Sequence, residues 1–161
     1  MKERTKPPHG NEEGFHRWDG MAMEYEYQVL LQSLVLASKP ELVIETGTGR
    51  GYTSAFIADA LVENGFGKLI TFEPDPKFAE EARANLAGMP VEVVNAPSST
   101  YTGRDPDFLF LDSGPEYRKD EIERWLSRPG LLVAVHDANR AYPLGLGLRL
   151  VGGDGFWVGR T

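Results

Sequence analysis

Short apolar runs alternate with amphipathic segments along most of the chain. Apolar residues recur at helical spacing in four segments, while runs that are apolar at every position are typical of strands buried on both faces. The expected helices cover residues 24–38, 54–64, 76–88 and 119–126. The expected strands cover residues 42–44, 69–72, 91–94, 108–111 and 131–135. Strands that alternate with helices predict a parallel sheet covered on both sides, which is an α/β fold.

The end of the chain departs from this alternation. Two short apolar runs, 148–151 and 156–159, flank the glycine-rich residues 152–155, and this pattern predicts an antiparallel hairpin. The connection over residues 95–107 is close to the minimum for a parallel crossover, and its prolines argue against a regular helix. The predicted fold is therefore an α/β sheet, mostly parallel, with a C-terminal antiparallel hairpin and trimmed crossovers.

Residues 1–23 have little periodicity and several glycines and prolines, so we expect an arm that precedes a domain of residues 24–161. Phe15, His16 and Trp18 are bulky for a solvated tail. They are expected either to pack on the domain or to form a lid over a substrate pocket. Phe15, Trp18 and Tyr25 are also candidates for the contact of a homodimer.

Composition narrows the classes of function. The 161 residues fit one domain with one core, and no apolar run reaches the length of a membrane span. The start of the chain is polar and does not resemble a signal peptide. The absence of cysteine excludes disulfides and thiolate metal sites. Together these features favour a cytoplasmic protein.

The charge of the chain disfavours a nucleic-acid partner. The formal net charge is −7, and an acidic surface repels phosphate groups. The basic residues of segment 118–124 are interleaved with acidic ones, which indicates a solvated helix face of mixed charge. The expected partner is therefore a small molecule, with neither nucleic acid nor a membrane.

A glycine-rich turn follows the first predicted strand. Gly47 and Gly49 are followed by a third glycine at the same spacing, which allows a sharp turn and a close approach of a ligand. That third glycine comes one residue too early for a dinucleotide-binding motif, and Tyr52-Thr53 stands where a P-loop needs its lysine. Glu73 ends the second strand, where a carboxylate can accept hydrogen bonds from both hydroxyls of a ribose or simply face solvent. The two features together predict a nucleoside-binding site.

Five segments of the sequence share a known pattern: Val43–Thr53, Leu69–Glu73, Val94–Ser98, Phe110–Asp112 and His136–Asp137. In this order they resemble the class I, Rossmann-like S-adenosylmethionine-dependent methyltransferases, in particular the catechol O-methyltransferase-like and related small-molecule O-methyltransferases. The resemblance implies a three-layer Rossmann-like fold, S-adenosylmethionine as cofactor, and methyl transfer to a hydroxyl of a small molecule. The alternatives are a non-catalytic cofactor- or partner-binding module of the same fold, and a protein that breaks down the sulfonium.

The resemblance also implies how the cofactor is held. Glu45 would contact the methionine ammonium, and Tyr52 and Thr53 would hold the methionine carboxylate. Glu73 would bind the ribose diol, and the segment after the third strand would flank the adenine. The full implied set is Glu45, Gly47, Thr48, Gly49, Tyr52, Thr53, Glu73, Pro74, Ala96, Pro97, Ser98, Asp112 and Ser113.

Asp112 and Asp137 match the two aspartates of the family's metal-dependent members. In those members an asparagine directly follows the second aspartate, whereas here Ala138 intervenes and Asn139 comes one residue later. Positions two apart in an extended segment point to the same side, so Asp112, Asp137 and Asn139 can converge on Mg²⁺ or another divalent cation. The alternative is that Asp137 only caps the turn after its strand.

The lysine that serves as the base in the catechol enzymes is Pro115 here, which argues against catechol as the acceptor. His136 is then a candidate general base, because an unperturbed imidazole titrates near neutral pH, or a packed histidine at the strand end. The candidate catalytic residues are Asp112, His136 and Asp137. Tyr117 and Arg118 are expected on the loop nearby, in reach of the acceptor.

Overall fold

The computed structural model describes residues 6–7, 10–138, 147–150 and 152–161. Its helices are α1 (Tyr25–Ser38), α2 (Tyr52–Asn64), α3 (Pro76–Asn85) and α4 (Pro115–Trp125), with a 3₁₀ turn, η1, at Ser98–Thr100. Its strands are β1 (Leu42–Thr46), β2 (Lys68–Phe72), β3 (Val91–Val94), β4 (Phe108–Leu111), β5 (Leu132–His136), β6 (Gly147–Leu150) and β7 (Phe156–Arg160). The predicted alternation of strands and helices is confirmed.

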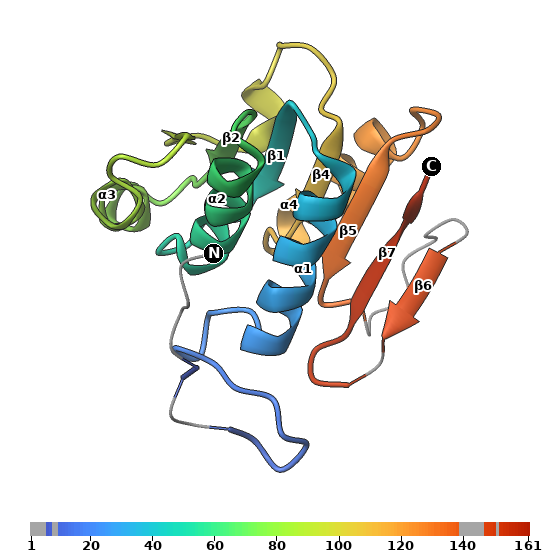
Figure 1. The fold of residues 1–161 in the computed structure, drawn as a ribbon. Coiled ribbons are helices and arrows are strands. Elements are labelled where there is room, and N and C mark those ends of the chain that lie inside the picture. The colour runs from blue at the N-terminus through green and yellow to red at the C-terminus, as the bar shows by residue number, and fades with distance from the viewer. Residues whose placement is uncertain (1–5, 8–9, 139–146, 151) are drawn as a thin grey trace.

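The strands form one sheet in the order β3-β2-β1-β4-β5-β7-β6 (Figure 1). β1 pairs in parallel with β2 and β4, while β3 and β5 extend the sheet in parallel on either side. β7 pairs antiparallel with both β5 and β6. The mostly parallel sheet with a C-terminal antiparallel hairpin is therefore confirmed, and η1 is the only helical turn between β3 and β4.

Alternate residues of the central strands enter two separate cores. Val43 faces the core formed with α1 and α2, whereas Leu42 and Ile44 face the core that contains Ile122 and Trp125 of α4. Figure 1 shows α1 and α2 on one face of the sheet and α4 behind it. Because both faces are covered, β1 is buried along its whole length, as its unbroken apolar run predicted.

Local sequence signals set the ends of the helices. Gly65 adopts a left-handed conformation with φ 77° and caps α2. Asp75 caps α3 by accepting hydrogen bonds from the amides of Lys77 and Phe78. The predicted end of α3 at Gly88 is wrong by three residues, because the helix stops at Asn85.

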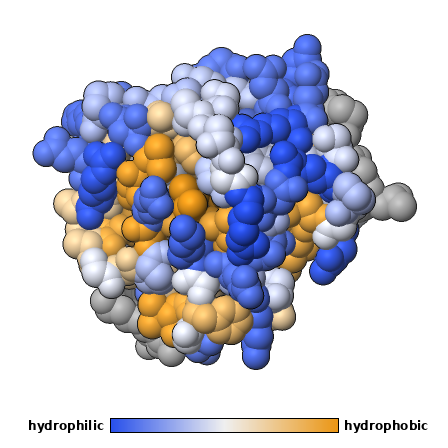
Figure 2. Space-filling model, turned by 90° about the horizontal axis from the view of Figure 1, so that it is seen from above, coloured by the Kyte–Doolittle hydropathy of each residue, from blue (hydrophilic) through white to orange (hydrophobic). Residues whose placement is uncertain are grey.

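The prediction for α4 needs two corrections. The helix begins at Pro115 and not at residue 119, since proline is favoured in the first turn of a helix. Its mixed charges do not all face solvent: Arg118 and Glu121 are 1% and 5% exposed, whereas Lys119, Asp120 and Glu123 are exposed. Figure 2 shows that hydrophilic residues cover most of the face seen from above, with hydrophobic patches between them.

The described part of the N-terminal arm packs on the domain. The ring of Phe15 lies 5.2 Å from that of Tyr27, and Trp18 stacks on Tyr52 at 6.0 Å. Both the backbone amide and the ring of His16 bond to Glu26. The packing alternative is therefore confirmed for these residues, and the lid alternative stays a prediction. Among the described residues no helix is long and apolar enough to cross a membrane.

Candidate active site

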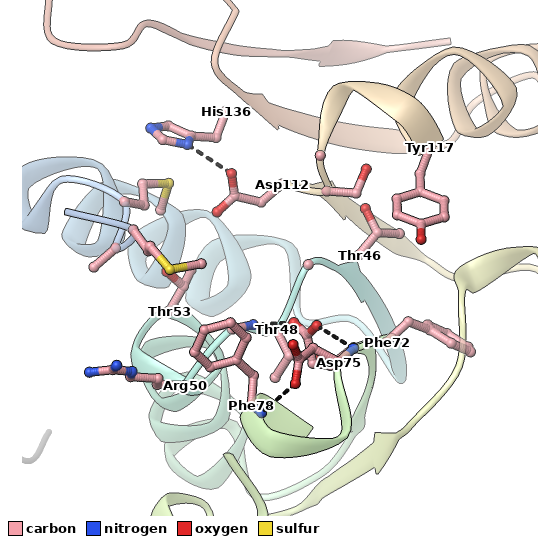
Figure 3. Close-up of a pocket in the computed structure, with 18 of the residues that line it drawn as sticks. Thr46, Thr48, Arg50, Thr53, Phe72, Asp75, Phe78, Asp112, Tyr117 and His136 are labelled. Atoms are coloured by element: carbon pink, nitrogen blue, oxygen red, sulfur yellow. Dashed lines mark hydrogen bonds and ion pairs between the residues drawn. The ribbon is translucent and has the colours of Figure 1, made fainter. Parts of the chain in front are cut away.

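A cavity of about 520 Å³ opens at the carboxyl ends of β1, β2, β4 and β5 (Figure 3). Open parallel sheets bind their ligands at this edge. The cavity brings together most of the residues that the sequence predicted. These are Gly47, Thr48, Gly49, Tyr52, Thr53, Glu73, Pro74, Pro97, Ser98, Asp112, Ser113, His136 and Asp137. Glu45 and Ala96 do not line it, and Asn139 lies outside the described residues.

The glycine turn forms one wall of this cavity. Gly47 has φ 82°, and a Cβ there would overlap the carbonyl oxygen of Asp112, so only glycine fits between β1 and β4. Gly49 has φ 53°, and a Cβ there would meet nothing within 4 Å. The turn therefore packs closely against the sheet at Gly47 and leaves open space at Gly49.

Glu73 is fixed by the backbone around it. One carboxylate oxygen accepts a hydrogen bond of 2.7 Å from the amide of Gly49, and the other accepts one of 3.0 Å from the amide of Asp75. The residue is 8% exposed and lines the cavity. Each oxygen can accept a further hydrogen bond. The carboxylate after β2 is thus held against the glycine turn after β1.

Glu45 lies behind the turn instead of in the cavity. It is fully buried and accepts a hydrogen bond from the hydroxyl of Ser54. Burial raises the pKa of Glu45 to about 8, although hydrogen bonds from Ser54 and Thr71 oppose this. Because Glu45 does not line the cavity, its contact with the methionine ammonium stays a prediction.

His136 lies between two carboxylates. Its Nδ1 is 2.8 Å from Asp112, and its Nε2 is 2.7 Å from Glu24. Burial alone would lower the pKa of His136, but the charges and hydrogen bonds of Asp112 and Glu24 raise it to about 10. Burial would likewise raise the pKa of Glu24, yet the bond to His136 helps to lower it to about 2. An imidazole that already holds its proton cannot act as a general base, so the structure favours the packed alternative.

Sequence reasoning missed Glu24, which connects this site to the arm and the hairpin. Its carboxylate accepts hydrogen bonds of 2.7 Å from Arg17 and from the amide of Asp154. Arg17 also pairs with the side chain of Asp154. No local pattern marks Glu24, because its partners lie at the two ends of the chain.

Asp112, His136 and Asp137 form the candidate metal cluster. One ligand atom from each lies within 4.8 Å of the others. Asp137 has a left-handed backbone, with φ 56°, directly after β5. Two carboxylates that line a cavity are ligands that a hard divalent cation accepts.

Helix α4 contributes residues that sequence reasoning placed elsewhere. Tyr117 lies on α4 and not on the predicted loop, and it lines the cavity, while its contact with the acceptor stays a prediction. The prediction that Arg118 reaches the acceptor is wrong, because its guanidinium is buried and donates to the backbone carbonyls of Ser113 and His136. Glu121, which was expected on a solvated face, is buried and lines the cavity.

The described lining of the cavity is strongly acidic. It contains only two guanidinium groups, from Arg17 and Arg50, and both are ion-paired. The carboxylates in the lining belong to Asp19, Glu73, Asp75, Asp112, Glu116, Glu121, Asp137 and Asp154. Such a cavity favours a cationic ligand over an anionic one.

Fold and site define a Rossmann-like α/β protein with a ligand cavity at its topological switch point. A family model described as a methyltransferase domain matches residues 44–138. The chain belongs to this methyltransferase domain family, which confirms the resemblance seen in the sequence.

Relatives and solved structures agree with this family. Catechol O-methyltransferase of Niastella koreensis is 32% identical over 127 residues, which cover 68% of this chain and 55% of that protein. Catechol O-methyltransferase of Mycobacterium tuberculosis is 32% identical over 130 residues, which cover 74% of this chain and 56% of that protein. The O-methyltransferase from Bacillus cereus in complex with SAH shares the fold, with a TM-score of 0.71, 22% identity, and coverage of 87% of this chain and 82% of that one. The chain spans about half the length of the curated relatives it matches.

Proposed function

We propose that this protein is an S-adenosylmethionine-dependent methyltransferase that methylates a hydroxyl of a small molecule. The observation behind the proposal is that the glycine turn after β1, Glu73 after β2 and Asp112 after β4 line one cavity. Family membership and the two catechol O-methyltransferase relatives support the same activity. The predicted cofactor-binding residues Ala96 and Glu45 are the exceptions, since neither lines the cavity.

The cavity fits the proposed cofactor in shape and in charge. The open space at Gly49 beside the fixed carboxylate of Glu73 accommodates a ribose, whose hydroxyls would donate to that carboxylate. Tyr52 and Thr53 begin α2, where backbone amides favour an anionic group such as the methionine carboxylate. The acidic lining suits the positive sulfonium and ammonium groups.

The residues of this chain would act mainly by placement. When bound, S-adenosylmethionine supplies an activated methyl group. Asp112, held by His136, and Ser113 would lie beneath the reacting centre, while Tyr117 and the arm residues Met21 and Met23 would enclose the acceptor. Holding donor and acceptor in contact lowers the barrier to an in-line displacement. A neutral or cationic acceptor is favoured over a nucleic acid because of the acidic lining.

A divalent cation is the finer part of the proposal. Asp112 and Asp137 would hold the cation, which would lower the pKa of the acceptor hydroxyl. The cation would thereby help to remove the hydroxyl proton, since Pro115 stands where the catechol enzymes have a lysine base. Assays of methyl transfer with EDTA and with added Mg²⁺ test this. Transfer that is insensitive to EDTA and to Asp137→Asn would overturn the metal role while leaving the methyltransferase in place.

Calorimetric titration with S-adenosylhomocysteine tests the cofactor site. Glu73→Ala should weaken binding about ten- to a hundredfold, or roughly 1.5–3 kcal/mol, through the loss of charged hydrogen bonds to the ribose. Glu80→Ala is the matched control, because Glu80 is an exposed carboxylate on the neighbouring helix α3. Equal affinity in Glu73→Ala and wild type would contradict the proposal.

The reaction is tested by mass spectrometry on a panel of phenolic and sugar acceptors. A methylated product supports the proposed activity. Cofactor binding without any product would instead indicate a binding module, and loss of the cofactor without an acceptor would indicate breakdown of the sulfonium.

A further inference from the structure

Four oxygen-bearing side chains meet at one end of the cavity. Glu121 of α4 accepts a hydrogen bond of 2.7 Å from the hydroxyl of Ser98 through one carboxylate oxygen. The other oxygen accepts hydrogen bonds from the hydroxyls of Thr46, at 3.1 Å, and Ser113. All four residues line the cavity, and Ser98, Ser113 and Glu121 are less than 10% exposed. The end of β1 and the segments after β3 and β4 therefore converge on the carboxylate of Glu121.

The chemistry of this cluster limits what it can bind. A hydroxyl has a single hydrogen to donate, and these three hydroxyls give theirs to Glu121. A carboxylate only accepts. The side chains of this cluster, defined as Thr46, Ser98, Ser113 and Glu121, therefore offer hydrogen-bond acceptors and no donors to a group in the cavity.

The cluster lies at the base end of the proposed cofactor site. Pro97 and Ser98 follow β3, beyond the Glu73 carboxylate that would bind the ribose. Figure 3 shows Thr46, Phe72 and Tyr117 on one side of the pocket, away from Arg50 and Thr53 at the methionine end. Phe72 and Tyr117 add aromatic surface to the lining there, which suits a planar base.

We infer that Glu121 is a specificity-determining residue that makes this end of the cavity select a 6-aminopurine over a 6-oxopurine. This inference rests on the proposed function and names the chemistry by which the base is recognised. The 6-amino group of adenine presents two N–H donors, which acceptors satisfy. The 6-oxo group of hypoxanthine is itself an acceptor. Opposite the acceptors of the cluster its oxygen would be buried without a hydrogen-bond donor, which weakens binding.

The test compares S-adenosylhomocysteine with its 6-oxo analogue, S-inosylhomocysteine, by calorimetric titration. The wild type should bind the amino form at least about tenfold more tightly, because an unpaired buried polar group costs about that much or more. In Glu121→Gln the side-chain amide can donate to one of the three hydroxyls, and that hydroxyl can then donate its own hydrogen to the 6-oxo group. The preference for the amino form should therefore fall to about threefold or less. Glu123→Gln should keep the wild-type preference, since its side chain is 66% exposed on the same helix.

A second variant keeps the test decisive if Glu121→Gln does not fold. Glu121→Ala removes the carboxylate and leaves the hydroxyls of Thr46, Ser98 and Ser113 free to donate, so the preference for the amino form should again fall to about threefold or less. An equal preference in the wild type and in both folded variants would overturn the role of Glu121 while the cofactor site stands. Failure of the wild type to bind either nucleoside would instead overturn the proposed function.

Discussion

Replacing Glu45 by glutamine removes an ionisable group from behind the glycine turn while keeping its size. The carboxyl is fully buried, bonded to Ser54, and its pKa is raised by burial to about 8. Asp112 and Glu73 act in the same direction as burial, because their negative charges oppose ionisation of a third carboxyl. Glu45→Gln therefore isolates the cost of a single buried acid.

The magnitude follows from the two pKa values. In the unfolded chain the carboxyl titrates at about 4.5, so between about pH 4.5 and pH 8 only the folded chain holds the proton. The contribution of Glu45 to the free energy of unfolding therefore falls as the pH rises, by roughly 1.4 kcal/mol per pH unit. Between about pH 5.5 and pH 7.5 the wild type should lose about 3 kcal/mol that Glu45→Gln does not lose.

Urea unfolding at several pH values, followed by tryptophan fluorescence, measures this difference. Any constant cost of the buried amide cancels, because only the change with pH is compared. Glu80→Gln, which alters an exposed carboxyl, should follow the wild type. Wild-type and Glu45→Gln stabilities that stay a constant amount apart across this range would refute the reasoning. A large loss of S-adenosylhomocysteine affinity in Glu45→Gln would support the predicted contact between Glu45 and the methionine ammonium.

Two further substitutions test the packing around the site. Gly47→Ala should destabilise the fold by several kcal/mol or prevent folding, because its Cβ would overlap the carbonyl of Asp112, and thermal melting would show this. Arg118→Met should lower the free energy of unfolding in urea by about 2–4 kcal/mol, since the carbonyls of Ser113 and His136 lose their donors. An exposed control, Lys119→Met, should change it by less than about 0.5 kcal/mol.

The sequence predicts the sheet well because its signals are local. Each central strand is a short unbroken apolar run, and burial on both faces is what such a run requires. The glycine turn was also predictable, because Gly47 and Gly49 can adopt positive φ without support from residues distant in the sequence. The start of α4 was not predicted, because residues 115–118 have no apolar periodicity and only the first-turn proline Pro115 marks it.

The polar partners within the site were not predictable in this way. Glu121 and Arg118 stand in a segment of mixed charge, and such a segment is normally solvated. Their partners are supplied by residues 46, 98, 113 and 136, which only the folded sheet brings together. The same holds for Glu24 and His136, which are separated by 112 positions. No pattern over a few residues contains these pairs.

The buried acid and the acidic cavity belong to one electrostatic system. Asp112 and Glu73 line the cavity, and both raise the pKa of Glu45 behind it. A cation bound near them would offset their charge, lower the pKa of Glu45 and favour release of its proton. An anion would do the reverse. The charge of the ligand and the stability of the fold are therefore coupled through this carboxyl, and a ligand with sulfonium and ammonium groups relieves a repulsion that an anionic ligand would increase.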